Sequence, residues 1–157
     1  MTANLKTRFG PAALVTGASN GIGRAFAEAL AERGFDLVLV ARRELVLQGL
    51  ARDLMAKHGV TVTTIAADLS APRAVDAILT RTAAMPIGLL VASAGFGSIG
   101  PFLELDAATE ANMVDVNCRS VVELTHGLST RMAAQGRGGV VLFSSVVGFG
   151  GAPFSAT

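Results

Sequence analysis

The sequence predicts an α/β fold built on one parallel sheet that is covered by helices on both faces. Short apolar runs of strand length alternate along the chain with longer segments whose apolar residues recur at helical spacing. The apolar runs are continuous, which is typical of strands buried on both faces. At 157 residues and 51% hydrophobic, the chain suits one domain with a substantial core and is too short for two full-sized domains.

The first strand and helix are expected between residues 12 and 34. Ala12–Thr16 is a short apolar run and predicts a buried strand. Apolar residues then recur three and four positions apart from Ile22 to Leu30, which predicts a helix with one buried face. Gly34 follows as a helix stop signal.

The second and third strands flank another helix. Asp36–Ala41 is a second apolar run, and Val60–Ala66 is rich in the β-branched residues that favour strands. Between them, leucines at positions 47, 50 and 54 repeat at helical spacing, and Gly59 ends this helix.

The remaining elements continue the alternation. Ser70 to Pro72 is typical of a helix start, with proline in the first turn. Leu89–Ala92 predicts the fourth strand, a long helix is expected from about Ala107 to Ala133, and Val140–Phe143 predicts the fifth strand. The long helix is expected to bury one stripe of residues: Val114, Cys118, Val121, Thr125, Leu128 and Met132. Right-handed crossovers then predict a doubly wound sheet with strand order 3-2-1-4-5.

Composition excludes several classes of protein. The 13 Lys and Arg nearly balance the 12 Asp and Glu, so no basic surface for nucleic acid is expected. Only 16% of residues are charged, which excludes an intrinsically disordered chain. A lone cysteine, Cys118, excludes an intrachain disulfide, is expected in the core, and fits a cytoplasmic location. His58 and His126 are isolated, so no metal site is expected. The uncharged stretch from residue 138 onward contains glycines, a proline and serines, and predicts a strand and a loop, not a membrane span.

A glycine-rich motif between the first strand and its helix predicts nucleotide binding. Thr16–Gly23 reads Thr-Gly-Ala-Ser-Asn-Gly-Ile-Gly. Glycines in this position permit a tight turn and let backbone N–H groups approach a pyrophosphate at the helix N-terminus. A glycine-rich turn without a ligand remains the alternative. The cofactor-binding residues expected here are Gly17, Ser19, Asn20, Gly21, Ile22 and Gly23.

The same motif resembles the Thr-Gly-x-x-x-Gly-x-Gly signature of the short-chain dehydrogenase/reductase family. Other segments resemble further motifs of that family in the same order: Asp68-Leu69, Ser93-Ala94-Gly95, Asn117 and the segment Ser144-Ser145-Val146-Val147-Gly148. Ser93 stands where the family has asparagine. The resemblance covers the chain from about Pro11. It implies a Rossmann-like domain over residues 1–157, in an enzyme that transfers a hydride between nicotinamide and a carbonyl or alcohol substrate.

The resemblance also implies roles for individual residues. Asp68 and Leu69 would contact the adenine, and Ser93, Ala94 and Gly95 would line the cofactor site. Ser145 would hydrogen-bond the substrate oxygen. Asn117 would hold part of the long helix open and fix a water in a proton relay. From the residues alone, Ser145 could equally cap a strand end, and Asn117 could be an ordinary buried polar residue.

The end of the second strand predicts a preference for NADP(H). A carboxylate there would bind the ribose 2′-OH of NAD and repel the 2′-phosphate of NADP. The residue at that position is Ala41, and Arg42 and Arg43 follow. A guanidinium is well shaped for phosphate, and cations are unfavourable at a helix N-terminus unless an anion binds there. The main phosphate ligand is expected to be Arg42, with hydrogen bonds to the same phosphate or to the ribose from Ser19 and Asn20. Two arginines that merely solvate a helix start remain the alternative.

The resemblance implies a catalytic tyrosine beyond the given sequence. The family's Tyr-x-x-x-Lys motif begins thirteen residues after the catalytic serine, so alignment to Ser145 puts the tyrosine one residue past Thr157, and the sequence contains no tyrosine. We therefore expect a partial chain that lacks the C-terminal strands and helices and is inactive alone. If the polypeptide ends at Thr157, a non-catalytic nucleotide-binding module is the alternative. The arginine pair disfavours a methyltransferase, whose methyl donor carries no phosphate.

Two loops are expected to hold the substrate. They are residues 94–103 and 148–154, which follow the fourth and fifth strands. Phe96, Phe102, Phe149 and Phe154 suggest a small-molecule substrate with an apolar or acyl-like part, although aromatic loop residues also serve as packing. The resemblance further implies a homodimer or homotetramer.

Overall fold

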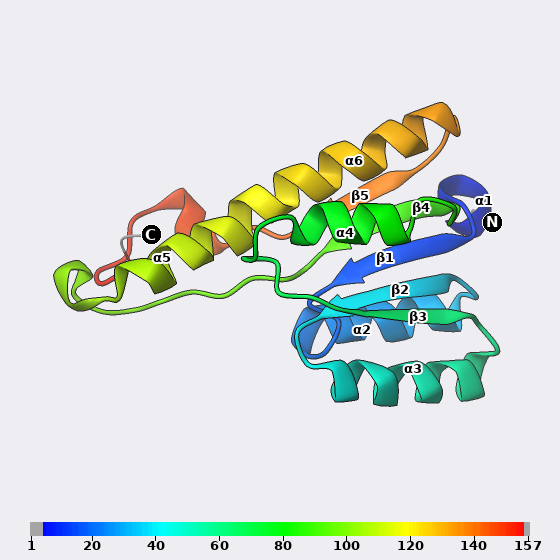
Figure 1. The fold of residues 1–157 in the computed structure, drawn as a ribbon, viewed down its shortest axis with the longest axis horizontal. Coiled ribbons are helices and arrows are strands. Elements are labelled where there is room, and N and C mark those ends of the chain that lie inside the picture. The colour runs from blue at the N-terminus through cyan, green and yellow to red at the C-terminus, as the bar shows by residue number, and fades with distance from the viewer. Residues whose placement is uncertain (1–4, 156–157) are drawn as a thin grey trace.

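The sheet has the strand order β3-β2-β1-β4-β5, and all neighbouring strands are parallel (Figure 1). The computed structural model describes residues 5–155, without the side chains of residues 146 and 147. Its strands are Ala12–Thr16 (β1), Asp36–Ala41 (β2), Val62–Ala66 (β3), Ile87–Ala92 (β4) and Gly139–Leu142 (β5). The predicted α/β class and strand order are confirmed.

Helices cover both faces of this sheet. The α-helices are Leu5–Phe9 (α1), Gly21–Glu32 (α2), Glu44–His58 (α3), Ala74–Arg81 (α4), Ala107–Val114 (α5) and Ser120–Ala134 (α6). Three shorter helical segments are Phe102–Glu104 (η1), Asp115–Arg119 (η2) and Val146–Phe149 (η3). In Figure 1, α2 and α3 lie on one side of the sheet, and α4 and α6 lie on the other. Within residues 5–155, no helix combines the length and apolar character needed to cross a membrane.

The central strand β1 contributes side chains to two hydrophobic cores, one on each face of the sheet. Its five residues are all buried, and successive side chains point to opposite faces. Ala13 and Val15 pack with residues of α2 and α3, whereas Leu14 packs with residues of α4 and α6. This double burial explains why β1 reads as a continuous apolar run instead of an alternating one.

The helix expected near Ser70 begins four residues later. Asp68 Oδ1 accepts hydrogen bonds from the backbone N–H of Ser70 at 3.0 Å and from its hydroxyl at 2.8 Å. Such a local turn competes with helix formation, because the Ser70 N–H already has a hydrogen-bond partner in a non-helical conformation. The helix α4 therefore starts at Ala74. The bounds of β3, β4 and β5 also differ by one or two residues from those expected.

The long helix is interrupted, and its buried stripe differs from the predicted one. Between α5 and α6, η2 is a π-helix whose wider turn holds an additional residue. The buried residues are Glu110, Met113, Val116, Ser120, Leu124, Leu128 and Met132. The prediction is thus right for Leu128 and Met132, whereas the predicted Val121 and Thr125 are half-buried. Val114 is 47% exposed and Cys118 is exposed, so Cys118 is not a core residue.

The short N-terminal helix α1, which the sequence analysis missed, lies against the sheet through two glycines. A Cβ added at Gly88 would lie 1.4 Å from the Phe9 carbonyl oxygen, and one at Gly139 would lie 2.7 Å from the Phe9 ring. Lys6 Nζ donates a hydrogen bond to the Gly34 carbonyl at 2.5 Å. Because Gly88 in β4 and Gly139 in β5 have no side chain, α1 can pack against these two strands.

We expect Gly88→Ala to destabilise the protein by about 1–3 kcal/mol, because the Phe9 backbone must move to admit the methyl group. Urea unfolding of the whole protein measures this. The control is Gly49→Ala in α3, where an added Cβ meets no heavy atom within 4 Å. That change should leave stability equal or raise it by up to about 1 kcal/mol, since alanine is the better helix former. Equal stability of the two variants would show that α1 does not pack here in solution.

Candidate functional site

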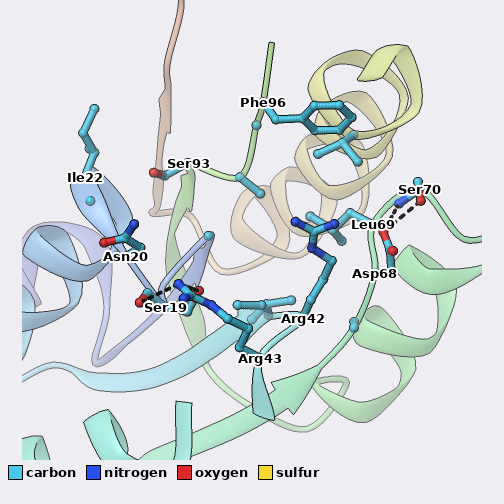
Figure 2. Close-up of a pocket in the computed structure, with 18 of the residues that line it drawn as sticks. Ser19, Asn20, Ile22, Arg42, Arg43, Asp68, Leu69, Ser70, Ser93 and Phe96 are labelled. Carbon is cyan, nitrogen blue, oxygen red and sulfur yellow. Dashed lines mark hydrogen bonds between the residues drawn. The ribbon is translucent and has the colours of Figure 1, made fainter. Parts of the chain in front are cut away.

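A cavity of about 690 Å³ opens at the carboxyl ends of β1, β2 and β4. In a doubly wound sheet this is the point where successive connections leave in opposite directions, and ligands characteristically bind there. The predicted cofactor residues that line it are Gly17, Ser19, Asn20, Gly21, Ile22, Arg42, Arg43, Asp68, Leu69, Ser93, Ala94 and Gly95 (Figure 2). Gly23, Asn117 and Ser145 do not belong to its lining.

Two glycines of the glycine-rich turn, Gly17 and Gly23, leave no room for a side chain. Gly17 has a φ of +66°, and a Cβ there would lie 2.9 Å from the backbone of Ser93 and Ala94. A Cβ at Gly23 would lie 2.5 Å from the Gly17 carbonyl oxygen, so Gly23 acts beneath the cavity by letting α2 pack on the turn. The side chain of Asn20, the N-cap residue of α2, makes no capping hydrogen bond. The first N–H groups of α2 thus remain available to an anion in the cavity.

Thr16 connects the two strand ends that form the cavity floor. Its side chain is 1% exposed, and its hydroxyl oxygen accepts the N–H of Ser93 at 3.1 Å and of Ala94 at 3.0 Å. The loop after β4 is therefore fixed against the glycine-rich turn after β1. This is a second reason, beyond the resemblance, for the threonine that begins the motif.

Two arginines from the end of β2 bring positive charge into the cavity wall. Arg43 Nη2 donates to the Ser19 carbonyl at 3.3 Å and to the Ser19 hydroxyl at 3.2 Å. Figure 2 shows Arg42 extended in another direction, toward Asp68 and Leu69. Among the ion pairs of residues 5–155, none involves Arg42 or Arg43. Both guanidinium groups thus keep donors free for a phosphate.

Asp68 is ionised at neutral pH. The N–H and then the hydroxyl of Ser70 hold the pKa of the Asp68 carboxyl below its usual range, and the positive charge of Arg42 acts in the same direction. Both bonds from Ser70 go to Oδ1. The carboxylate is exposed at the cavity rim, where it can accept further hydrogen bonds through its second oxygen.

Asn117 lies within the π-helix η2 and clamps the loop after β4. Its Nδ2 donates to the Phe96 carbonyl at 2.7 Å, and its Oδ1 accepts the Phe96 N–H at 3.1 Å. Gly95 permits the approach, since a Cβ there would lie 3.1 Å from Oδ1. Asn117 is therefore not a polar residue that bonds its own helix. It holds Phe96, which does line the cavity.

Ser145 follows β5 and is exposed. Its carbonyl accepts the N–H of Gly148 at 3.0 Å, which begins the turn of η3. The preceding Phe143 lines the cavity and packs edge-on against Phe26 of α2, with ring centroids 5.5 Å apart. The side chains of Val146 and Val147, and the expected catalytic position beyond Thr157, lie outside the described residues. No group of three His, Cys, Asp or Glu that could hold a metal ion occurs in the part of the chain that the structure describes.

Several residues of the cavity wall were missed by sequence reasoning. They are Val40, Ala67, Ser70, Thr109, Asn112, Val116 and Phe143. Those in and after α5 reach the cavity because the loop from Phe96 to Asp106 brings that helix back over the strand ends. Helical spacing places Thr109, Asn112 and Val116 on one helix face, but nothing in the sequence shows what that face meets.

Comparisons with known proteins show the family of the chain. The family model described as short chain dehydrogenase matches residues 11–157. The 7beta-hydroxysteroid dehydrogenase of Collinsella aerofaciens is 31% identical over 152 residues, covering 97% of this chain and 58% of that protein. Very-long-chain 3-oxoacyl-CoA reductase-A of Danio rerio is 34% identical over 148 residues, covering 92% of this chain and 46% of that protein. The chain thus spans about half the length of these relatives.

Solved structures give the same result. A 7beta-hydroxysteroid dehydrogenase structure superposes with a TM-score of 0.93 at 31% identity, covering 97% of this chain and 59% of that one. A short-chain dehydrogenase from Sphingobium yanoikuyae in complex with NADPH superposes with a TM-score of 0.84 at 38% identity, covering 88% of this chain and 55% of that one. With its sheet order, its glycine-rich turn and this match over nearly all of its residues, the chain belongs to the short-chain dehydrogenase family.

Proposed function

We propose that the protein binds NADP(H) in the cavity and that the whole protein transfers a hydride between the nicotinamide and a carbonyl or alcohol substrate. The observation that carries the proposal is the pair Arg42 and Arg43, which line the cavity beside the glycine-rich turn and form no ion pair within residues 5–155. Family membership supports the reaction class, and a neighbour that binds NADPH supports the cofactor. We propose residues 1–157 as the nucleotide-binding part of the enzyme.

The cavity residues fit a dinucleotide. The N-terminal N–H groups of α2 and the backbone cradle at Gly17 suit the pyrophosphate. Arg42 and Arg43 suit the 2′-phosphate, because a guanidinium makes two parallel hydrogen bonds to phosphate oxygens. Asp68 and Leu69 line the same wall and suit the adenine. When bound, the nicotinamide supplies the hydride chemistry, and the protein supplies orientation and proton transfer.

Ser145 and Asn117 are the proposed catalytic and positioning residues. The Ser145 hydroxyl would donate a hydrogen bond to the substrate oxygen and stabilise negative charge as it develops there. Asn117 would act through Phe96 by fixing the loop that faces the reacting groups. The general acid is expected beyond Thr157, as the family resemblance implies.

We expect Asn117→Ala to lower kcat by about 10–10² at nearly unchanged NADPH affinity, because loss of the clamp lets the Phe96 loop shift by about an ångström. Steady-state kinetics and NADPH titration of the whole protein separate the two effects. Thr130→Val is the control, since the exposed Thr130 hydroxyl donates its hydrogen bond to the His126 carbonyl within the same helix, α6. A parallel loss of kcat in both variants would contradict the positioning role of Asn117.

NADPH consumption by the whole protein in the presence of ketones tests the proposed function. We expect reduction with NADPH and much slower reduction with NADH. NADPH binding without turnover of any carbonyl or alcohol would favour the non-catalytic module instead. Absence of nucleotide binding would contradict the proposal entirely. A homodimer or homotetramer and a cytoplasmic location stay predictions.

A further inference from the structure

Large apolar side chains are gathered in the two loops expected to hold the substrate, and they are exposed. Ile99 and Leu103 are 81% and 96% exposed, and Phe149 is 94% exposed. Phe102 and Phe154 are also exposed. We call these five residues the apolar lip. Single apolar residues on a surface are ordinary, but a group of them marks a binding surface.

The two loops of the apolar lip are joined. The backbone N–H of Gly100 donates a hydrogen bond to the Phe154 carbonyl at 2.9 Å. The second loop is closed on itself by the Ser155 N–H, which donates to the Ala152 carbonyl at 3.2 Å. The first loop is shaped by η1, where the Glu104 N–H donates to the Pro101 carbonyl at 2.8 Å. The lip is therefore one surface, although its residues lie about fifty positions apart in the sequence.

Both loops that carry the apolar lip follow a phenylalanine that lines the cofactor cavity. Phe96 lines the cavity and begins the first loop, where Asn117 holds its backbone. Phe143 lines the cavity just before Ser145 and the second loop. A substrate oxygen held at Ser145 would thus leave the rest of the substrate beside the lip.

Charge divides the site into two ends. The end with Arg42, Arg43 and Asp68 is charged. Residues 94–103 and 138–155 contain no Asp, Glu, Lys or Arg, and the next residue, the exposed Glu104, is acidic, so the lip offers no cationic partner to a carboxylate substrate. Burying a charged group there would be costly without such a partner.

We propose that the substrate is a ketone or secondary alcohol that carries a large, uncharged apolar group, which packs on the apolar lip. The inference rests on the proposed function and names its substrate class. In the reducing direction the ketone carbon gains a hydride from NADPH and its oxygen gains a proton, so the products are the secondary alcohol and NADP⁺. The lip contacts only the apolar group and takes no part in these transfers.

The test compares three ketones with the whole protein and NADPH: acetone, 2-octanone and 7-oxooctanoate. All three are methyl ketones, and the last has a carboxylate where 2-octanone has its terminal methyl. Each buried methylene contributes up to about fourfold in kcat/KM, so we expect 2-octanone to exceed acetone by about 10². We expect 7-oxooctanoate to fall at least about tenfold below 2-octanone.

Substitutions in the apolar lip test whether it causes the preference for 2-octanone. Leu103→Gln and Phe149→Ser should each lower kcat/KM for 2-octanone by about tenfold or more, at unchanged Kd for NADPH. Leu45→Gln is the matched control, because Leu45 is 82% exposed on α3 and lies outside the cavity. It should leave all three substrates unaffected.

Three outcomes would overturn the inference. In the first, acetone or 7-oxooctanoate matches 2-octanone while NADPH is consumed. In the second, the lip variants keep the preference for 2-octanone. In the third, they change the oligomeric mass in sedimentation without changing the preference, which would make the lip a contact between copies of the chain. If no ketone is reduced at all, the proposed function itself fails.

Discussion

Replacing Arg42 and Arg43 together by alanine is expected to weaken NADPH binding by about 10²–10³ and to change NADH binding by less than about threefold. Each guanidinium can make charge-assisted hydrogen bonds to the 2′-phosphate, worth about 1.5–3 kcal/mol apiece, and neighbouring contacts do not add fully. NADH lacks that phosphate, so it loses nothing comparable. Nucleotide titration of the whole protein measures both dissociation constants.

The matched control removes two arginines elsewhere. Arg52 in α3 and Arg81 in α4 are exposed, make no ion pair among the described residues, and lie outside the cavity. Their double alanine variant carries the same net charge as the Arg42/Arg43 variant and should bind NADPH normally. Equal losses for NADPH and NADH in the Arg42/Arg43 variant would mean that the arginines support the fold instead of the phosphate.

Ala41→Asp tests how a carboxylate at the end of β2 changes the preference between NADPH and NADH. A carboxylate at the end of β2 would repel the 2′-phosphate and accept a hydrogen bond from the ribose 2′-OH of NADH. Added to the double arginine variant, it should make NADH the tighter ligand. A variant that still prefers NADPH would show that the preference arises elsewhere in the cavity.

Gly23→Ala is expected to lower both the stability of the fold and the affinity for NADPH. The added Cβ would lie 2.5 Å from the Gly17 carbonyl oxygen, 2.7 Å from its carbonyl carbon and 2.9 Å from the Thr16 carbonyl oxygen. All three are backbone atoms, so no side chain can rotate away and α2 must lift from the turn. We expect a destabilisation of about 3 kcal/mol and at least about 10²-fold weaker NADPH binding.

Gly49→Ala is again the control, since the same change there meets open space in α3. Urea unfolding and NADPH titration of both variants give the comparison. If Gly23→Ala does not fold, we expect its yield of soluble protein to fall well below that of Gly49→Ala, and this yield is then the measurement. Normal stability together with normal NADPH affinity would contradict the packing of α2 on the glycine-rich turn.

The parts of the fold that the sequence predicts best are those where local pattern and tertiary burial agree. β1 and β2 have the expected bounds because both strands are buried on each face and all their residues except Thr16 and Asp36 are apolar. The glycine-rich turn is recognisable because its glycines are required by φ and by close backbone approach. Most of the predicted cofactor residues that line the cavity lie in this turn and at the strand ends.

The parts that the sequence does not predict depend on contacts distant in the chain or on local competition. The π-turn at Asn117 shifts the buried stripe of the preceding helix, and the shift follows from one asparagine held by Phe96, twenty-one residues away. The late start of α4 follows from Asp68, which bonds Ser70 before the helix can begin. The position of α1 depends on side chains that Gly88 and Gly139 lack. Hydrophobic periodicity and secondary-structure propensity do not predict these contacts.

We expect the cavity to select the phosphorylated dinucleotide through the arginines at the end of β2. Calorimetric titration of the whole protein with NADPH and with NADH, at equal salt concentration, measures this selection. We expect a Kd for NADPH at least about tenfold below that for NADH. Equal or tighter binding of NADH, or no binding of either nucleotide, would rule out selection by these arginines.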